Sequence, residues 1–353
     1  MINVLIVEDS PVARKLLEHI IGSEPALHVM GTANDGLEAL AFLARHKPDV
    51  ITMDVDMPKM DGLEATRRIM ESPQPVPIVM VSAAYAPQEV ALTFRALEAG
   101  ALAAVEKPRG PGHEDSEALA RKLVQTVKAM SEVRVVRRWA RQPAEVGKSE
   151  AKVASPVPFV APRHKIEVVA IGVSTGGPPV LETILSRLPQ DFAAPVLIVQ
   201  HIAAGFLPGL VSWLMQVTKF PVRIAVQGEA LLAGHAYLAP DGHHMGVAGR
   251  HISLDAAAPE NGLRPAVSYL FRSVAQVFGA NAAGVLLTGM GRDGADELKL
   301  MKDKGAVTIA QDAASSVVHG MPGEAIKLGA AIHILPPDKV AALLVGLVNR
   351  KSI

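Results

Sequence analysis

The feature that most constrains the fold of this chain is a repeated alternation of short apolar, β-branched segments with segments of helical periodicity. Such alternation predicts parallel strands joined by crossover helices, because parallel neighbours cannot be connected by a tight hairpin. In the first part of the chain, strands are expected at 3–7, 28–32, 50–53, 78–81 and 102–105, and helices at 12–21, 36–45, 62–71, 89–99 and 116–131.

The alternation stops at 140–165, where "ARQPAEVGKSEAKVASPVPFVAPRHK" mixes proline, alanine, serine and charge without an apolar period. That composition is typical of a linker, and a chain of 353 residues is expected to hold about two domains. Strands and helices then alternate again around one probable hairpin, "HHMGVAGRHISLD". The later strands are expected at 168–171, 196–199, 222–226, 284–287, 307–310 and 331–335.

The fold class predicted from these patterns is α/β, with two doubly wound parallel sheets. The first domain, at 1–131, is expected to be a flavodoxin-like (βα)5 unit. The second, at 165–353, is expected to be a Rossmann-like α/β unit that carries the hairpin, and the linker between them is placed at 132–164.

Composition narrows the classes of function. The 35 basic and 35 acidic residues balance, so the charge favours neither nucleic acid nor an anionic membrane as a partner. There is no cysteine, which excludes disulfides, thiolate catalysis and thiolate zinc sites. No secretory signal is evident in "MINVLIVEDSP", and no apolar run is long enough to span a membrane. We expect a cytoplasmic protein with proteins or small molecules as partners, without membrane insertion.

Polar residues follow several strands of the first predicted sheet. Glu8 and Asp9 end the first strand, Asp54 ends the third, Ser82 ends the fourth and Lys107 follows the fifth. Ligands of doubly wound sheets bind beyond the carboxyl ends of the strands, so these side chains are expected at one edge. Three converging carboxylates call for a hard cation such as Mg²⁺. The set suits phosphoryl transfer to Asp54, with Lys107 neutralising charge and Ser82 bonding the phosphoryl group.

Three motifs, "VEDS", "DVDMPKMDG" and "EKP", resemble the receiver domain of bacterial response regulators over about the first 130 residues. The resemblance implies that Asp54 is the phosphoacceptor and that the bond before Pro108 is cis, a form that proline makes accessible. It also implies four Mg²⁺ ligands: Glu8, Asp9, Asp54 and the backbone carbonyl of Asp56.

The alternative for this first site is that its acids are solvated loop residues or helix N-caps. Asp61 fits that alternative well because it directly precedes a predicted helix, and Asp56 is also ambiguous. Five matched positions on one predicted edge favour the phosphorylation site over the alternative.

The stretch "IGVSTGGP" at 171–178 can be interpreted as a phosphate cradle or as the mount of a nucleophile. Ser174 stands where a dinucleotide-binding motif needs its second glycine, so close approach of a pyrophosphate is disfavoured. Gly172 to Gly176 instead fits G-x-S-x-G, in which a sharp strand-to-helix turn presents the serine hydroxyl. A serine here can also be a simple helix cap, and a nucleophilic serine needs a base.

Two further strand ends offer a base and an orienting acid. His201 directly follows the strand "PVLIVQ", and Asp293 lies in the glycine-rich loop of "GVLLTGMGRDGAD". Asp296 is the competing acid, but its place suits the first turn of a helix. The fold is expected to bring Ser174, His201 and Asp293 together. Their chain order differs from that of α/β-hydrolases, so the chemistry carries over and the topology does not.

The motifs "GVSTGGP", "VQH", "LTGMGRDGA" and "QDAASSVVHGMP" resemble the catalytic domain of the chemotaxis protein-glutamate methylesterases, from about residue 165 to the C-terminus. A receiver followed by this domain is that family's architecture. The resemblance implies hydrolysis of glutamate γ-methyl esters on the cytoplasmic helices of chemoreceptors, with release of methanol, and deamidation of receptor glutamines. It also implies a chemotaxis histidine kinase as phosphodonor, and no cofactor for the esterase step.

By the same resemblance, Ser174 attacks the ester, His201 transfers protons, and Asp293 holds the imidazole tautomer and stabilises its cation. Thr175 and Met290 match positions beside the nucleophile, where backbone N–H groups are expected to stabilise the oxyanion.

Two features depart from the simplest picture. Ala266 stands where the family often has serine, which bears on the substrate surface. His243 and His244 could suggest a metal, but adjacent residues of a strand point apart and no carboxylate pattern completes a site.

Two other functions are possible. One is an output domain that only binds proteins, with Ser174 as a helix cap, and the other is a DNA-binding regulator, which the strand-rich second domain disfavours.

The flexible linker motivates one hypothesis on regulation. The unphosphorylated receiver is expected to cover the cleft at Ser174, and phosphorylation of Asp54 to weaken that contact.

Overall fold

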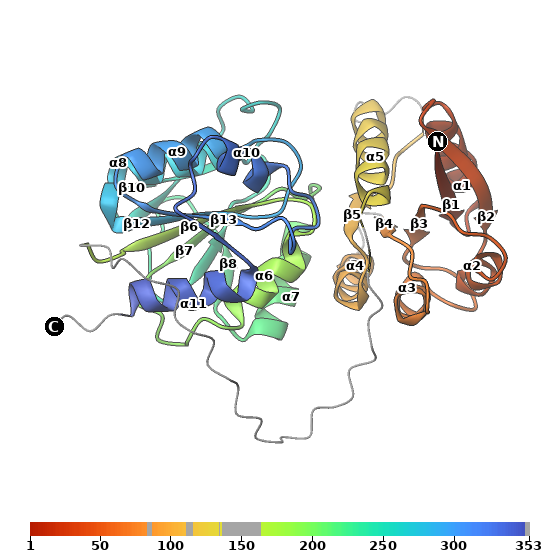
Figure 1. The fold of residues 1–353 in the computed structure, drawn as a ribbon, viewed down its shortest axis with the longest axis horizontal. Coiled ribbons are helices and arrows are strands. Elements are labelled where there is room, and N and C mark those ends of the chain that lie inside the picture. The colour runs from red at the N-terminus through yellow and green to blue at the C-terminus, as the bar shows by residue number, and fades with distance from the viewer. Residues whose placement is uncertain (83–86, 111–115, 134, 136–163, 350–353) are drawn as a thin grey trace, which may run out of the picture.

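The structure, a computed structural model, describes residues 1–82, 87–110, 116–133, 135 and 164–349 (Figure 1). It confirms an α/β fold with two parallel sheets. The predicted linker at 132–164 and the last residues, 350–353, lie largely outside this part of the chain, so the predicted domain boundaries stay predictions.

The first domain contains a five-stranded sheet in the order β2-β1-β3-β4-β5, in which every pair is parallel. Helices α1 and α5 cover one face, and α2, α3 and α4 cover the other (Figure 1). The elements are β1 (Ile2–Val7), α1 (Pro11–Gly22), β2 (Leu27–Ala33), α2 (Gly36–Leu43), β3 (Val50–Asp54), α3 (Gly62–Glu71), β4 (Ile78–Ser82), α4 (Pro87–Ala99), β5 (Ala103–Glu106) and α5 (Ser116–Ser131).

The second domain contains a seven-stranded sheet in the order β14-β13-β12-β6-β7-β9-β8 and a separate hairpin, β10-β11. Helices α8, α9 and α10 cover one face, and α6, α7 and α11 cover the other (Figure 1). The strands are β6 (Val168–Val173), β7 (Val196–Gln200), β8 (Val222–Ile224), β9 (Ala236–Leu238), β10 (His244–Ala248), β11 (His251–Asp255), β12 (Ala282–Leu286), β13 (Val307–Gln311) and β14 (His333–Leu335). The helices are α6 (Gly177–Leu185), α7 (Leu207–Thr218), α8 (Val267–Val277), the short η1 (Gly279–Asn281), α9 (Ala295–Asp303), α10 (Met321–Lys327) and α11 (Pro337–Val348).

Burial explains why these segments form strands and helices. Every residue of the central strands β3, β4, β6, β7, β12 and β13 is buried, as expected for parallel strands covered on both faces. Three helices of the first domain begin at polar caps, which are Ser10 for α1, Asp35 for α2 and Asp61 for α3. The Oδ1 atom of Asp61 accepts a hydrogen bond of 2.8 Å from the N–H of Glu64. The cap interpretation was therefore correct for Asp61.

One strand was missed and one expectation was wrong. The strand β9 was not foreseen, because its three residues lie between a glycine and a proline and form no recognisable pattern. The bond before Pro108 was expected to be cis, but among the described residues the cis bond is Arg264–Pro265. The trans form is the more stable one for a bond to proline.

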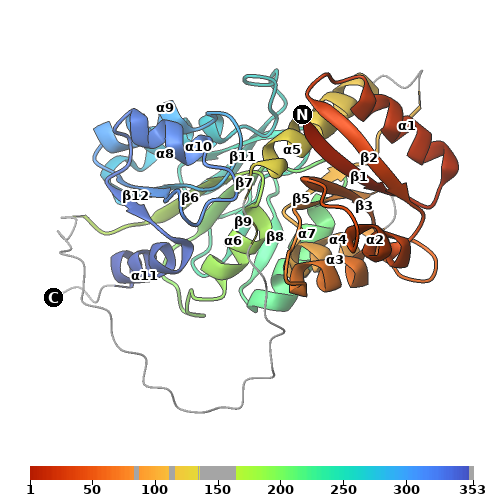
Figure 2. The same cartoon turned by 45° about the vertical axis from the view of Figure 1, so that its right-hand side comes forward.

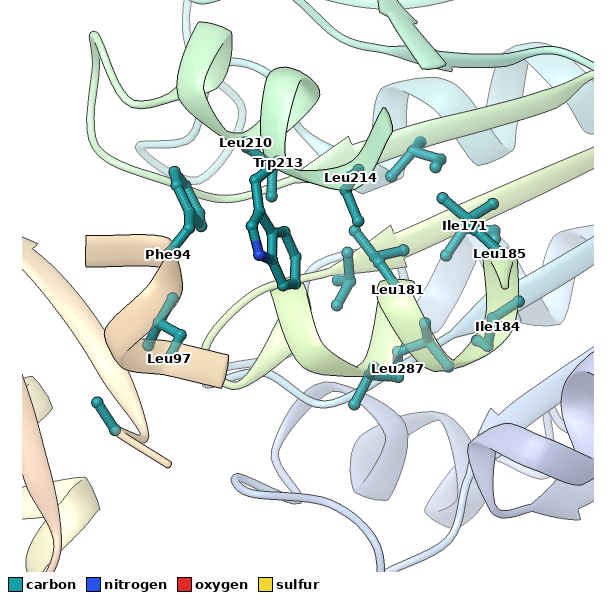
Figure 3. Packing of buried hydrophobic residues seen from close by; sticks show 14 of the residues in the cluster. Phe94, Leu97, Ile171, Leu181, Ile184, Leu185, Leu210, Trp213, Leu214 and Leu287 are labelled. Carbon is teal, nitrogen blue, oxygen red and sulfur yellow. The ribbon is translucent and has the colours of Figure 1, made fainter. Parts of the chain in front are cut away.

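The two domains are in contact. Helix α4 of the first domain packs on α7 and α6 of the second, as the view in Figure 2 shows. The ring of Phe94 stacks on the indole of Trp213, with centroids 5.8 Å apart, and Leu97 lies beside them (Figure 3). Both aromatic side chains are buried. No helix in the described part of the chain is long and apolar enough to cross a membrane.

Candidate functional site

The first candidate site lies at the carboxyl edge of the five-stranded sheet. Glu8 and Asp9 follow β1 and Asp54 ends β3, and these three residues offer oxygens that lie within 4.8 Å of one another. Lys107, which follows β5, places its Nζ atom 2.9 Å from Oε2 of Glu8 and 2.9 Å from Oδ2 of Asp54. The structure therefore brings together four of the predicted residues.

Ser82 is the last residue of β4 and is buried at the same edge, and its carbonyl accepts a hydrogen bond from the N–H of Lys107. Asp56 follows β3 and is exposed. The participation of its carbonyl in metal binding stays a prediction.

Electrostatics at this edge favour a bound cation. Burial and the nearby charge of Glu8 raise the pKa of Asp54 to about 6, against the lowering effect of Lys107. Burial lowers the pKa of Lys107, but the two carboxylates outweigh it and the net pKa is raised. One ammonium leaves a cluster of three carboxylates with net negative charge. Carboxylate oxygens are the donors that Mg²⁺ prefers, so the donor set fits the magnesium site expected of a receiver domain.

The second candidate site is built on the central strands of the seven-stranded sheet. Val173 of β6 pairs with Gln200 of β7, so Ser174 and His201 follow the ends of neighbouring parallel strands. The N–H of His201 donates to the carbonyl of Val173, and the N–H of Ser174 donates to the carbonyl of Thr288, which follows β12. Strand pairing thus places Ser174 between the loop that follows β7 and the loop that follows β12.

Glycines shape the turn after Ser174. Gly176 has φ +78°, in the left-handed region that favours glycine, and it caps helix α6. A Cβ atom on Gly289 would lie only 2.7 Å from the Cβ of Ser174, so the 289–290 loop lies against the serine. Met290, at the end of that loop, is half-buried.

His201 and Asp293 form a close contact between two ionisable side chains at this site. Nε2 of His201 lies 3.0 Å from Oδ2 of Asp293, although the ring N–H is poorly aligned for a linear hydrogen bond. Both side chains are more than nine-tenths buried. Asp296 instead pairs with Arg292 on the exposed first turn of α9, as its place in the sequence suggested.

The carboxylate of Asp293 also caps helix α8. It accepts hydrogen bonds from the N–H of Val267 at 2.7 Å, from the N–H of Ser268 at 3.0 Å, and from the hydroxyl of Ser268 at 2.6 Å. Burial alone would raise the pKa of Asp293, but His201 and these donors outweigh it and hold the pKa below its usual value. Asp293 is therefore stabilised as an oriented anion beside the imidazole.

A cleft of about 560 Å³ opens over this second site. The second domain contributes Ser174, Thr175, Gln200 and His201 to its lining, among other residues. The opposite wall belongs to the first domain and consists of β5, Leu102, Phe94 and Leu97 of α4, and four residues of α5, among them Lys122. The cleft thus lies between the two domains.

Sequence reasoning missed two residues of the second site. Ser268, which bonds Asp293, belongs to a helix start that showed no motif in the sequence. Gln200, whose amide contacts both Ser174 and His201, was quoted in "VQH" but given no role. The two adjacent histidines form no metal site: both ring nitrogens of the buried His244 lie within hydrogen-bond distance of backbone groups.

Comparison with known proteins identifies the families of both domains. Residues 169–344 match the CheB methylesterase family, and residues 4–136 match the response regulator receiver domain. A protein-glutamate methylesterase/protein-glutamine glutaminase of Nitrosospira multiformis is 56% identical over 353 residues, which cover 100% of this chain and 98% of that protein. Such a protein of Syntrophus aciditrophicus is 57% identical over 349 residues, 98% of either chain.

Among solved structures, the crystal structure of the Thermotoga maritima CheB methylesterase catalytic domain is 36% identical, with a TM-score of 0.50. It covers 52% of this chain and 100% of its own. The length of the shared alignments, the two matched domains and the arrangement of residues at the two strand edges lead to one conclusion: the chain belongs to the protein-glutamate methylesterase/protein-glutamine glutaminase family.

Proposed function

We propose that this protein hydrolyses glutamate γ-methyl esters on the cytoplasmic helices of chemoreceptors, releases methanol, and deamidates receptor glutamines. The observation that carries the proposal is the convergence of three strand ends, with His201 3.0 Å from Asp293 and Ser174 at the end of the neighbouring strand. Ser174, Thr175 and His201 also line one cleft, where a substrate side chain can enter.

The geometry supports a Ser-His-Asp mechanism. The Oγ atom of Ser174 attacks the γ-carbonyl carbon while its proton passes to His201. Because Nε2 of His201 faces Asp293, Nδ1 is the ring nitrogen left to exchange the proton with the serine. Asp293 stabilises the imidazolium, which then gives this proton to the leaving group as its bond to the γ-carbon breaks. The methoxide oxygen leaves as methanol, or the glutamine nitrogen leaves as ammonia, and Ser174 carries the acyl group. Water, activated by the same imidazole, releases the glutamate and restores the serine.

Backbone donors beside the serine are the natural oxyanion stabilisers. Thr175 follows the nucleophile directly, and the loop that ends at Met290 lies against the Cβ of Ser174. In other hydrolases, removal of one such donor costs about 3 kcal/mol of transition-state stabilisation.

In the first domain, Asp54 is the proposed phosphoacceptor and a chemotaxis histidine kinase the proposed donor. Glu8, Asp9 and Asp54, with the carbonyl of Asp56, would hold Mg²⁺, which supplies charge neutralisation during phosphoryl transfer. Lys107 contacts the acceptor carboxylate, and Ser82, which is buried at the same edge, is the residue proposed to bond the added phosphoryl group.

Regulation follows from the position of the cleft. A wall of the cleft over Ser174 belongs to the first domain, so a receptor helix can reach the serine only when this wall moves away. Phosphorylation adds about −1.5 to −2 charges at Asp54 and would weaken the contact between the domains. A shift of about 1–3 kcal/mol suffices for regulation of this kind.

The test is the release of methanol from methylated receptors, with and without a small phosphodonor. A truncated chain of residues 164–353 should outperform the unphosphorylated full chain, and equal rates would rule out occlusion. The catalytic domain of the Thermotoga maritima relative crystallised alone, so the truncation is practicable. Ser174→Ala should abolish methanol release while Asp54 still accepts phosphate. A serine-directed acylating reagent that fails to label Ser174 would favour a domain that only binds proteins.

A further inference from the structure

The buried side chain of Gln200 makes an unusual pair of contacts. Its Nε2 atom donates to the backbone carbonyl of Ser174 at 2.9 Å and to that of His201, also at 2.9 Å. Because both partners are carbonyl oxygens, only the amide nitrogen can face them, which fixes the orientation of the amide. One side chain therefore connects the backbone of the proposed nucleophile to that of the proposed base.

The oxygen of the same amide lacks a hydrogen-bond partner. Oε1 of Gln200 is buried and has no hydrogen-bond donor among the described residues. A buried polar atom without a partner is destabilising, so such atoms in native proteins call for an explanation. The unpaired oxygen of Gln200 costs stability, so a role in stability alone does not account for this arrangement of the amide.

The neighbouring helix makes room for this arrangement. A Cβ atom on Gly177, the first residue of α6, would lie 2.2 Å from Oε1 of Gln200 and 2.6 Å from Cγ2 of Val173, and both contacts are severe clashes. The second glycine of "STGG" is thus required by the glutamine amide that packs against it, in addition to any demand of the turn itself.

We infer that Gln200 is a positioning residue, which fixes the backbone at Ser174 relative to that at His201 so that hydroxyl and imidazole stay in register for proton transfer. The inference rests on the proposed Ser-His-Asp mechanism. Rates of such reactions are sensitive to the alignment of the reacting groups, and an error of about 1 Å can cost roughly 100-fold. A loop restrained only by strand pairing would allow errors of that size.

Gln200→Leu tests the inference in the phosphorylated full chain. The substitution keeps the volume of the side chain and removes both hydrogen bonds, so we expect kcat for methanol release to fall by about 10- to 100-fold with KM little changed. The labelling rate of Ser174 by a fluorophosphonate, which needs no receptor, should fall in parallel.

Thr308→Val is the matched control. The hydroxyl of Thr308 is also fully buried and bonds the carbonyl of Ala330, but at the opposite end of strand β13. This variant should lose comparable thermal stability and keep the wild-type kcat. If Gln200→Leu also lowers only the melting temperature, the role of Gln200 is structural and the inference is wrong.

Gln200→Glu gives a readout that a loss of stability would not produce. A carboxylate cannot donate to either carbonyl, whereas a protonated carboxyl group can donate to one of them. The ratio of the variant's kcat to the wild-type kcat should therefore rise as the pH falls from about 8 to 5. Only the variant carries an ionisable side chain at position 200, because the glutamine amide of the wild type does not titrate. A ratio that does not change with pH contradicts the inference.

A double-mutant cycle with Gly177→Ala completes the test. The added methyl group should lower kcat strongly in the wild type, because it displaces the amide. It should lower kcat less in a Gln200→Ala background, where the contact with Cγ2 of Val173 remains and the contact with the amide is gone. Fully additive effects would contradict the inference. Failure of the mechanism itself would look different, because Ser174→Ala would then retain methanol release.

Discussion

The contact between Phe94 and Trp213 allows the proposed occlusion to be tested with a single substitution. Phe94 is fully buried, and its ring stacks on the indole at an interplanar angle of 20°. Phe94→Ala removes this stacking, worth about 0.5–1.5 kcal/mol, and the burial of a ring face, worth roughly 1.5 kcal/mol more. The contact between the domains should weaken by about 2–3 kcal/mol in total.

Because about 1.4 kcal/mol changes an equilibrium tenfold, the closed arrangement should lose roughly 30- to 140-fold in population relative to the open one. The unphosphorylated Phe94→Ala protein should therefore release methanol markedly faster than the unphosphorylated wild type. This rate should not exceed the rate of the truncated chain of residues 164–353, which lacks the first domain that covers the cleft.

Phe42→Ala is the matched control, because Phe42 lies on α2 of the same domain and packs over Gly31, away from the second domain. It should destabilise the first domain without raising the unphosphorylated rate. Equal rates for wild type and Phe94→Ala, in proteins that remain folded, would refute the proposed role of this contact. Equal activation by both variants would point to unfolding of the first domain instead.

Four further predictions follow from single observations. Nε1 of Trp213 is buried and has no partner among the described residues, so Trp213→Phe should stabilise the closed arrangement and lower the unphosphorylated rate by roughly 5-fold or more; a faster enzyme would contradict this. Ser268→Ala removes a 2.6 Å hydrogen bond to Asp293 and should reduce kcat about 10-fold, whereas wild-type kcat would show that the bond is dispensable. The folded-state pKa of Asp293 is lowered, so its carboxylate contributes stability above about pH 4 that is lost as the pH falls through the folded pKa. The difference in unfolding free energy between wild type and Asp293→Asn, measured with urea, should therefore shrink from pH 7 to pH 3; a constant difference would contradict the assignment. Removal of Mg²⁺ with a chelator should prevent phosphoryl uptake at Asp54 and leave fluorophosphonate labelling of Ser174 in the truncated chain unchanged; loss of that labelling would place the metal at the wrong site.

The sequence predicted the edges of the two sheets well, for a simple physical reason. Carboxyl ends of parallel strands lie at one edge, so polar residues that directly follow apolar strands must lie near one another. This reasoning brought Glu8 together with Asp54 and Lys107, and His201 together with Asp293, across large separations in the chain. It needed only the strand pattern and the expectation of parallel sheets.

Features that depend on tertiary packing could not be predicted in this way. Ser268 and Gln200 act through bonds to loops whose paths no local pattern specifies. The stacking of Phe94 on Trp213 joins residues of two domains, each of which looks like an ordinary buried aromatic in its own helix. The short strand β9 has too few residues for a period, and the isomer of the bond before Pro108 depends on the surrounding loop.

The central claim is that the side chains at 174, 201 and 293 act as one catalytic unit. The most direct test compares methanol release by Ser174→Ala with release by the triple variant Ser174→Ala, His201→Ala, Asp293→Asn, both phosphorylated and shown to be folded. Residues of one unit are strongly non-additive, so the account predicts the same residual rate for both variants. A single variant that keeps substantial activity, or a triple variant that loses a further large factor, would contradict it.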